Sequence, residues 1–263
     1  MAIGSSFLRM LPVFLVAVVA LVLVAAALGR SAEQNNGDTI QQPSRQASAQ
    51  VRSFAAADVF FQFNVTERDI GIHGFFDAEG WKNVRIVSPD GRIFEVAGKG
   101  SLKEIGFTEL MFESVEPSIP EDLTLKQFLA LFPKGKYKFF GTTVEGDRLV
   151  GTDRLTHRIP DAPTLVSPKE GEEVDPDATF IVNWKPVTGS FRGPSGIEIV
   201  GYQVIVEREN PLRTFSVDLP PSTTKVQVPP EFLEPGTEYT VEVLAIEASG
   251  NRTITESSFT TLP

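Results

Sequence analysis

The stretch "FLEPGTEYTVEVLA" (residues 232–245) decides how the second half of the chain folds. Its last residues alternate apolar and polar side chains, which is the pattern of a strand with one face in a core. The spacing Leu233-x-Pro235-Gly236-x-x-Tyr239 precedes and opens that strand. This spacing is typical of a tyrosine corner, where the chain crosses between two sheets and the tyrosine hydroxyl bonds an upstream backbone group. We therefore expect a β-sandwich with Tyr239 in its core.

The rest of residues 161–263 reads as further strands around this corner. Alternation and turn residues predict seven strands, at residues 164–168, 179–187, 200–209, 213–220, 223–229, 237–248 and 252–261. Trp184 on the second strand, Tyr202 on the third and the corner before Tyr239 follow one another in an order that resembles a fibronectin type III domain. The resemblance covers about residues 161–263 and implies a sandwich that binds partners or spaces other domains, with catalysis unusual.

The resemblance also implies where such a domain binds. In that family three loops gather at one end of the sandwich, and here they are residues 186–197, 220–223 and 249–252. Loops of this kind carry binding residues because a rigid scaffold positions them. The candidate binding residues are Phe191, Arg192, Ser222, Asn251 and Arg252. For Phe191 the alternative is that its ring packs back onto the sandwich.

Residues 58–160 are expected to form a second β-sandwich. Strand patterns occur at residues 59–65, 69–77, 82–88, 92–98, 108–114, 135–144 and 148–157. A capping box of Thr124 and Gln127 predicts one short helix at about residues 124–132. The order of proline, glycine, Tyr137 and an alternating strand repeats the order around Tyr239. This echo favours an immunoglobulin-like sandwich, and a jelly-roll-like sandwich is the alternative. The predicted fold class is all-β, with two tandem immunoglobulin-like sandwiches.

The first 57 residues differ from the rest in composition. Residues 11–28 carry no charge and are apolar or small, and Arg9 precedes them. This pattern predicts that residues 1–30 are a signal peptide or an N-terminal membrane anchor, and small residues at 25–29 leave cleavage open. Residues 31–57 are rich in Gln, Asn, Ser and Ala, and we expect them to be a disordered linker. Both readings predict an exported protein, whether secreted, periplasmic or on the cell surface.

Charge and composition narrow the classes of partner. The formal net charge of −10 argues against nucleic acid and against anionic membrane surfaces, so the membrane is expected only through the N-terminal segment. The chain has no cysteine, which excludes disulfides, thiol nucleophiles and cysteine-based zinc sites. The expected partner is a protein or a polysaccharide outside the cytoplasm.

Residues with catalytic or metal-binding chemistry are sparse. The two histidines, His73 and His157, stand alone in strand patterns, and no cofactor motif occurs. A calcium site is the one metal hypothesis, because Asp161 at the domain boundary and Asp175 and Asp177 in an acidic loop offer oxygen ligands.

Three function classes follow from these patterns. The first is an exported, non-catalytic binding, adhesion or scaffold protein. The second is an accessory carbohydrate-binding protein, which would stack sugars on Phe75, Phe76 and Trp81 if these rings are exposed. The third is a hydrolase, for which Glu109, Glu113 and Glu116 are the carboxylates that lie close together in the sequence.

Overall fold

The computed structural model describes residues 49–191 and 196–263, which lie in one compact unit and are nearly all β. The fold class expected from the sequence is therefore confirmed. The predicted signal or anchor (residues 1–30) and most of the predicted linker (residues 31–57) lie outside the described residues. Among the residues that are described, no helix is long and apolar enough to cross a membrane.

The end of the predicted linker is a correction. Strand β1 (Val51–Ser53) pairs in parallel with β7 (Arg148–Leu155), and the linker prediction for residues 51–57 is wrong. The physical reason is Phe54, a single large apolar residue that is only 9% exposed. Its ring packs edge-on against Phe76 and Phe139, with centroids 6.2 and 6.0 Å away. Burial of one such ring contributes about 2–3 kcal/mol, which helps to hold this segment on the domain.

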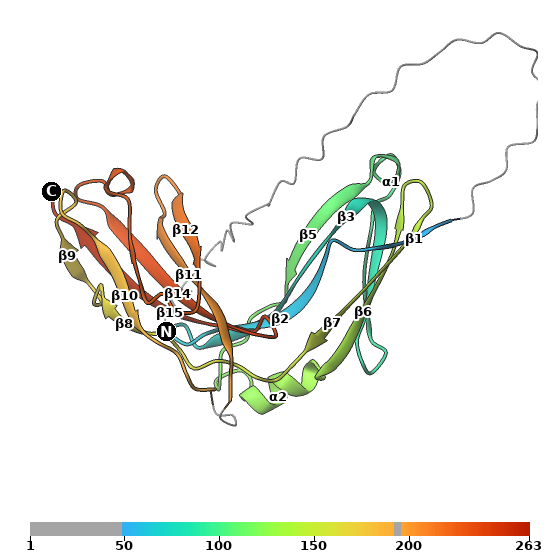
Figure 1. The fold of residues 1–263 in the computed structure, drawn as a ribbon, viewed down its shortest axis with the longest axis horizontal. Helices are drawn as coiled ribbons and strands as arrows, with labels where there is room; N and C mark the ends of the chain where they lie inside the picture. Colours follow the sequence, from blue (N-terminus) through green and yellow to red (C-terminus); the bar gives the residue numbers. More distant parts are fainter. Residues whose placement is uncertain (1–48, 192–195) are drawn as a thin grey trace, which may run out of the picture. The chain divides into compact units, whose positions relative to one another are not determined.

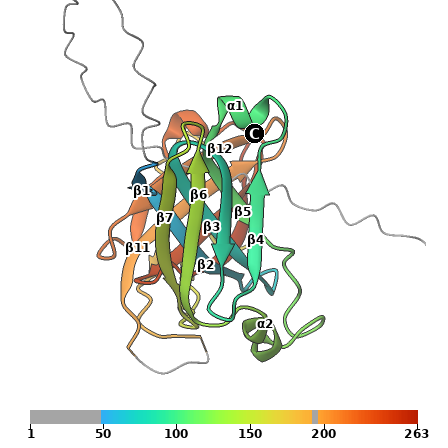
Figure 2. The same ribbon diagram turned by 90° about the vertical axis from the view of Figure 1, so that its right-hand side faces the viewer.

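The strands of the first domain form two layers that share one long strand, and all of them belong to one hydrogen-bonded sheet. That strand is β3 (Asp69–Val87), and the others are β2 (Ala56–Asn64), β4 (Ile93–Ala97), β5 (Phe107–Glu113), β6 (Gly135–Thr143), β1 and β7. The first half of β3 lies between β2 and β5, and its second half lies between β4 and β6. Strands β1, β7, β6 and β3 lie side by side in that order (Figure 2). The aromatic core of the domain lies between the two layers.

Strand β3 joins two strands that the sequence predicts as separate. The segment that separates the two predicted strands, residues 78–81, is instead an irregularity within β3, where the pairing register shifts between Asp77 and Trp81. Trp81 is 2% exposed and its ring lies 5.3 Å from that of Phe76. The indole therefore belongs to the core, and it draws the glycine-containing segment into the sheet.

Two short helices lie at opposite ends of the first domain (Figure 2), α1 (Leu102–Ile105) and α2 (Leu125–Leu131). The predicted capping box is present in α2, because Thr124 Oγ1 accepts from the Gln127 backbone and the Gln127 side chain accepts from the Thr124 backbone. Phe128 on α2 is 1% exposed and packs on Phe61 of β2. The helix thus closes one end of the core.

The second domain is a sandwich of two sheets (Figure 1), and its core contains Trp184, Tyr202 and Tyr239. One sheet has the order β13-β10-β8, and the other contains β12, β11, β14 and β15, with β9 paired to β15. The strands are β8 (Thr164–Ser167), β9 (Glu172–Val174), β10 (Ile181–Lys185), β11 (Ile199–Arg208), β12 (Arg213–Leu219), β13 (Lys225–Gln227), β14 (Glu238–Glu247) and β15 (Arg252–Thr261). All seven predicted strands are present, and the short β9 is the one that the sequence pattern missed.

The tyrosine corner is formed as expected. The Tyr239 hydroxyl accepts a hydrogen bond from the Glu234 backbone N–H at 2.8 Å and donates to the Phe232 carbonyl at 3.2 Å. A short 3-10 helix (Pro230–Phe232) leads into it. Gly236 has φ +61°, a left-handed conformation that glycine adopts without steric cost.

Tyr137 does not form a second corner, so the echo in the sequence was wrong in this respect. The residue is 5% exposed and lies on β6, but its hydroxyl has no hydrogen-bond partner among the described residues. Burial raises the pKa of Tyr137 to about 12. The repeated pattern reflects an alternating strand after a glycine rather than a crossing between sheets.

The sheets of the two domains are joined edge to edge. Residues of β2 pair in parallel with β15 in the register Gln62 to Arg252, Phe63 to Thr253 and Asn64 to Ile254. Figure 1 shows β2 beside β15, where the colours of the first and last parts of the chain meet. One continuous ladder therefore runs from β3 through β2, β15 and β14 to β11.

Candidate functional site: the junction and the loops around it

Asn251, predicted as a binding-loop residue, is instead the centre of the domain junction. It is 0% exposed. Its side-chain oxygen accepts from the Phe61 backbone N–H at 2.8 Å, and its amide nitrogen donates to the carbonyls of Thr156 at 3.2 Å and Arg158 at 2.7 Å. One side chain thus satisfies three backbone groups of the first domain and its exit segment.

Arg252, the next predicted loop residue, is also part of the junction. Its guanidinium carbon lies 4.0 Å from the centre of the Phe60 ring of the first domain, which is a cation–π contact. The Phe60 ring also stacks on the ring of His73 in β3, and the two ring centroids are 5.6 Å apart. Burial lowers the pKa of Arg252 to about 10, so the guanidinium is charged at neutral pH. The Arg252 guanidinium is therefore partly buried against Phe60 and does not project from a loop tip toward a ligand.

The remaining candidate loop residues are spread apart. The Phe191 ring packs edge-on against Phe63 at 4.9 Å, and its backbone N–H donates to the Ile159 carbonyl at 2.8 Å. It therefore lies on the first domain rather than at a free loop tip. Ser222 is exposed in the turn between β12 and β13. Arg192 lies outside the described residues. The prediction that these five residues form one binding surface has no support in the described geometry.

The three aspartates of the calcium hypothesis do not gather around a common point. Asp161 packs against Gly189, where a Cβ would lie 2.0 Å from its carboxylate oxygen. Asp175 accepts a hydrogen bond from the Asp177 backbone at 2.9 Å, which is an ordinary loop contact. Within residues 49–191 and 196–263, no three His, Asp or Glu side chains are placed to hold a metal ion.

The histidines make structural contacts. His73 is 1% exposed, and its Nε2 lies 2.9 Å from a carboxylate oxygen of Glu116, while Glu113 is 3.9 Å from its Nδ1. His157 Nε2 lies 2.9 Å from the Phe132 carbonyl. Of the carboxylates considered for a hydrolase, Glu113 and Glu116 meet at His73 and Glu109 is exposed further along β5.

The aromatic platform that a carbohydrate-binding surface needs is not present at the predicted residues. Phe76 is 0% exposed and Trp81 is 2% exposed, because both side chains fill the core between the sheets. Phe75 is partly buried. Phe75, Phe76 and Trp81 therefore do not form the exposed row of rings that the carbohydrate-binding prediction requires.

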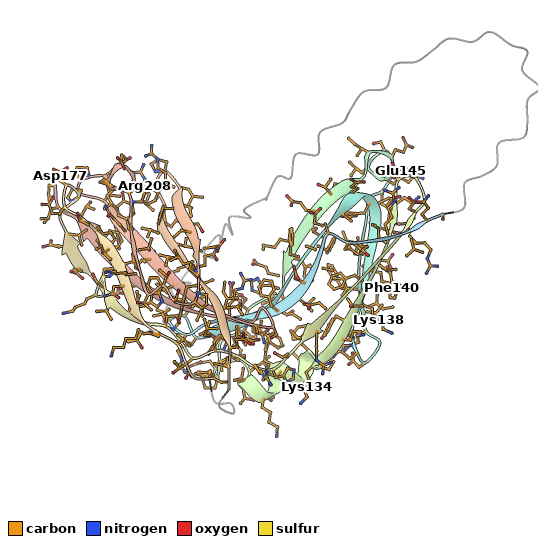
Figure 3. The ribbon with its side chains drawn as sticks, in the orientation of Figure 1. Lys134, Lys138, Phe140, Glu145, Asp177 and Arg208 are labelled. Atoms are coloured by element: carbon orange, nitrogen blue, oxygen red, sulfur yellow. The ribbon has the colours of Figure 1, made fainter. Side chains whose placement is uncertain are left out.

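The structure adds a surface hollow that the sequence did not indicate. A shallow hollow of about 670 Å³ lies beside the start of β2 and parts of β6 and β7. The carboxylate of Asp153, which lines the hollow, accepts a hydrogen bond from the Val59 backbone N–H at 2.8 Å. Lys138 and Phe140, labelled on β6 in Figure 3, form part of its lining. Its residues come from three separate segments, so no local motif could have predicted it.

Comparisons with known proteins bear on the second domain. The family model of the fibronectin type III domain matches residues 166–261. None of the curated proteins compared with the chain matches it.

Solved structures with some similarity include a two-domain fibronectin type III segment of chicken tenascin, at 12% identity and a TM-score of 0.27, covering 78% of this chain and 97% of that one. Fibronectin(III)-like modules of Clostridium thermocellum CbhA match at 11% identity and a TM-score of 0.31, covering 80% and 92%. An α-L-rhamnosidase of Streptomyces avermitilis matches at 18% identity and a TM-score of 0.31, covering 40% and 10%.

The family match, the formed tyrosine corner and the strand order agree with one another. Residues 166–261 of this chain are a fibronectin type III domain.

Proposed function

We propose that the chain is an exported, non-catalytic binding or scaffold protein whose two sandwiches act as one rigid unit. Fibronectin type III domains are in general adhesion or scaffold modules, which supports this class. The partner we propose is a protein outside the cytoplasm, because the acidic surface is unsuited to nucleic acid.

The observation that carries the proposal is the domain junction. Domains in one chain usually move relative to each other unless their interface is large or well bonded. Here a β ladder, the buried Asn251 and the Arg252–Phe60 contact all cross from one sandwich to the other. A scaffold benefits from such a connection, since surfaces on both sandwiches then keep a fixed spacing for a partner.

A distance measurement between spin labels tests the rigid unit. The natural chain has no cysteine, so the exposed pair Arg154→Cys and Glu238→Cys carries the only labels. We expect one narrow distance distribution, and we expect Asn251→Ala to broaden it because three backbone groups of the junction lose their partner.

Two controls make this test specific. Asn183→Ala on β10 removes an asparagine of the same sandwich away from the junction, and it should leave the distribution narrow. A label pair within the first domain, Arg154→Cys with Glu95→Cys, should stay narrow in the Asn251→Ala background. A broad distribution in the unmutated chain would contradict the proposed rigid unit.

A further inference from the structure

The first domain contains a cavity of about 360 Å³ between β4, β5 and α2, which we call the β4–β5 cavity. Strands β4 and β5 pair with opposite halves of β3, and in the described chain no ladder joins them to each other. The gap between their edges is spanned by the rings of Phe94 and Phe112, which stack with centroids 4.7 Å apart. The cavity lies beside this aromatic bridge.

The walls of the cavity are apolar and remain accessible at the rim. Ile72 and Ile86 from the two halves of β3 form part of the walls. Ile93, Phe94 and Leu131 at the rim are 57%, 44% and 47% exposed. Large apolar side chains left in water around a concave apolar site are typical of a binding site, and cavities of about 300–1,000 Å³ hold small molecules.

Tyr137 supplies a polar group in this apolar lining. The residue lines the cavity, is 5% exposed, and its hydroxyl has no partner among the described residues. Because a buried hydroxyl without a partner is unfavourable, this group gains when a bound molecule offers an acceptor. Burial raises the pKa of Tyr137 to about 12, so the phenol stays protonated and available as a donor.

The charges at the cavity argue against an anion, and its mainly apolar walls make any charged ligand unfavourable. Arg92 lines the cavity, but its guanidinium Nε donates to the Asp90 carboxylate at 2.8 Å, so its charge is already matched. Glu113 lines the cavity as well and repels an anion. We propose that the β4–β5 cavity binds a small, uncharged, mainly apolar molecule whose carbonyl or hydroxyl oxygen accepts a hydrogen bond from Tyr137.

Competition between two compounds of the same shape tests this proposal. Residues 47–263 form a compact unit, so the chain from residue 47 is used. N-phenyl-1-naphthylamine, an uncharged dye that fluoresces in apolar sites, reports occupancy. Two compounds are then tested for displacement of the dye. The first is acetophenone, and the second is α-methylstyrene, in which a methylene group replaces the carbonyl oxygen of acetophenone. In Tyr137→Phe we expect acetophenone to compete about 3- to 10-fold more weakly, with α-methylstyrene unchanged.

Matched variants separate the cavity from other changes. Tyr202→Phe removes a buried tyrosine hydroxyl from the second domain and should leave both compounds unaffected. Leu131→Glu at the exposed rim should weaken binding of the dye and of both competitors, whereas Leu102→Glu, at a similarly exposed leucine on α1, should not.

Three results would overturn the proposal: no binding of the dye, no effect of Leu131→Glu, or an equal response of both compounds to Tyr137→Phe. A cavity that accepts only an apolar side chain of a partner protein would give the first or the third of these results. The proposed scaffold role does not depend on any of them, because its test concerns the domain junction.

Discussion

All three tyrosines of the chain are buried, but within residues 49–191 and 196–263 only two of them have a hydrogen-bonded hydroxyl. The Tyr239 hydroxyl bonds Glu234 and Phe232 at the corner, and the Tyr202 hydroxyl accepts from the Val187 backbone N–H at 2.8 Å. The Tyr137 hydroxyl has no partner within the described chain. The same chemical group therefore stabilises the fold at two positions and does not at the third.

Replacing each tyrosine by phenylalanine makes this difference measurable. Tyr239→Phe and Tyr202→Phe should each lower the free energy of unfolding by about 1–3 kcal/mol, because backbone groups in or near the core lose their partner. Tyr137→Phe should leave it unchanged or raise it, because no bond is lost and a buried polar atom is removed.

Denaturant unfolding of the three variants checks this prediction. The aromatic ring is retained in every case, so packing changes are small and the variants control for one another. A loss for Tyr137→Phe as large as that for Tyr239→Phe would show that the Tyr137 hydroxyl does have a partner.

How well the sequence predicts a residue depends on how far along the chain its partners lie. Tyr239 bonds groups five and seven residues away, so its spacing alone predicts its role. Asn251 bonds Phe61 from 190 positions away. No pattern around Asn251 carries that information, which is why a turn residue was predicted as a binding residue.

At the scale of elements, the strands were predictable and their connections were less so. The alternation of β11, β14 and β15 is strong because one face of each packs in the core of the second sandwich. The prediction divided β3 at residues 78–81, whereas the buried Trp81 at the register shift keeps these residues in the sheet. The β4–β5 cavity follows from which strands β3 pairs with, and pairing partners are not encoded locally.

The central ladder also brings two carboxylates face to face. Glu242 on β14 pairs directly with Glu256 on β15, an arrangement of like charges that destabilises a sheet. Burial first, and then the nearby Glu256 and Glu207, raise the pKa of Glu242 to about 8. The folded state therefore holds a proton that the unfolded state releases near its ordinary pKa of 4.5.

Because Glu242 binds this proton more tightly in the folded state, we expect the stability of the protein to depend on pH. Between about pH 4.5 and 8 the folded state binds more protons than the unfolded state, so the free energy of unfolding falls as pH rises. A difference of one in pKa between the two states corresponds to about 1.4 kcal/mol. Glu242→Gln removes this contribution and should stabilise the protein at pH 8 relative to the unmutated chain.

Unfolding curves at pH 5 and pH 8 measure the effect. Some dependence should remain in Glu242→Gln, because burial also raises the pKa of Asp69 to about 7. Glu238→Gln, an exposed residue on the same strand, should not change the slope. If Glu242→Gln leaves the difference between the two pH values intact, the carboxyl of Glu242 is not protonated in the folded state.

For the whole molecule, composition and pattern predicted the fold class and the family of the second domain, while the junction came from the structure. Two sandwiches in sequence are compatible with a flexible pair or a joined pair, and the sequence does not distinguish them. A joined pair differs from a flexible pair by contacts such as that of Arg252 with Phe60, and these contacts join residues that are far apart in the sequence. Three of the five predicted binding residues thus proved to hold the domains together.

Export is the remaining prediction at this scale, and it rests on residues 1–30. The uncharged apolar run after Arg9 should place residues 49–263 on the far side of the cytoplasmic membrane. Since the chain lacks cysteine, the exposed variant Glu238→Cys provides a single reactive thiol. A charged maleimide that cannot cross the cytoplasmic membrane should label it in intact cells as fully as in lysed cells. Deletion of residues 1–30 should confine labelling to lysed cells, and labelling only after lysis in the full chain would contradict export.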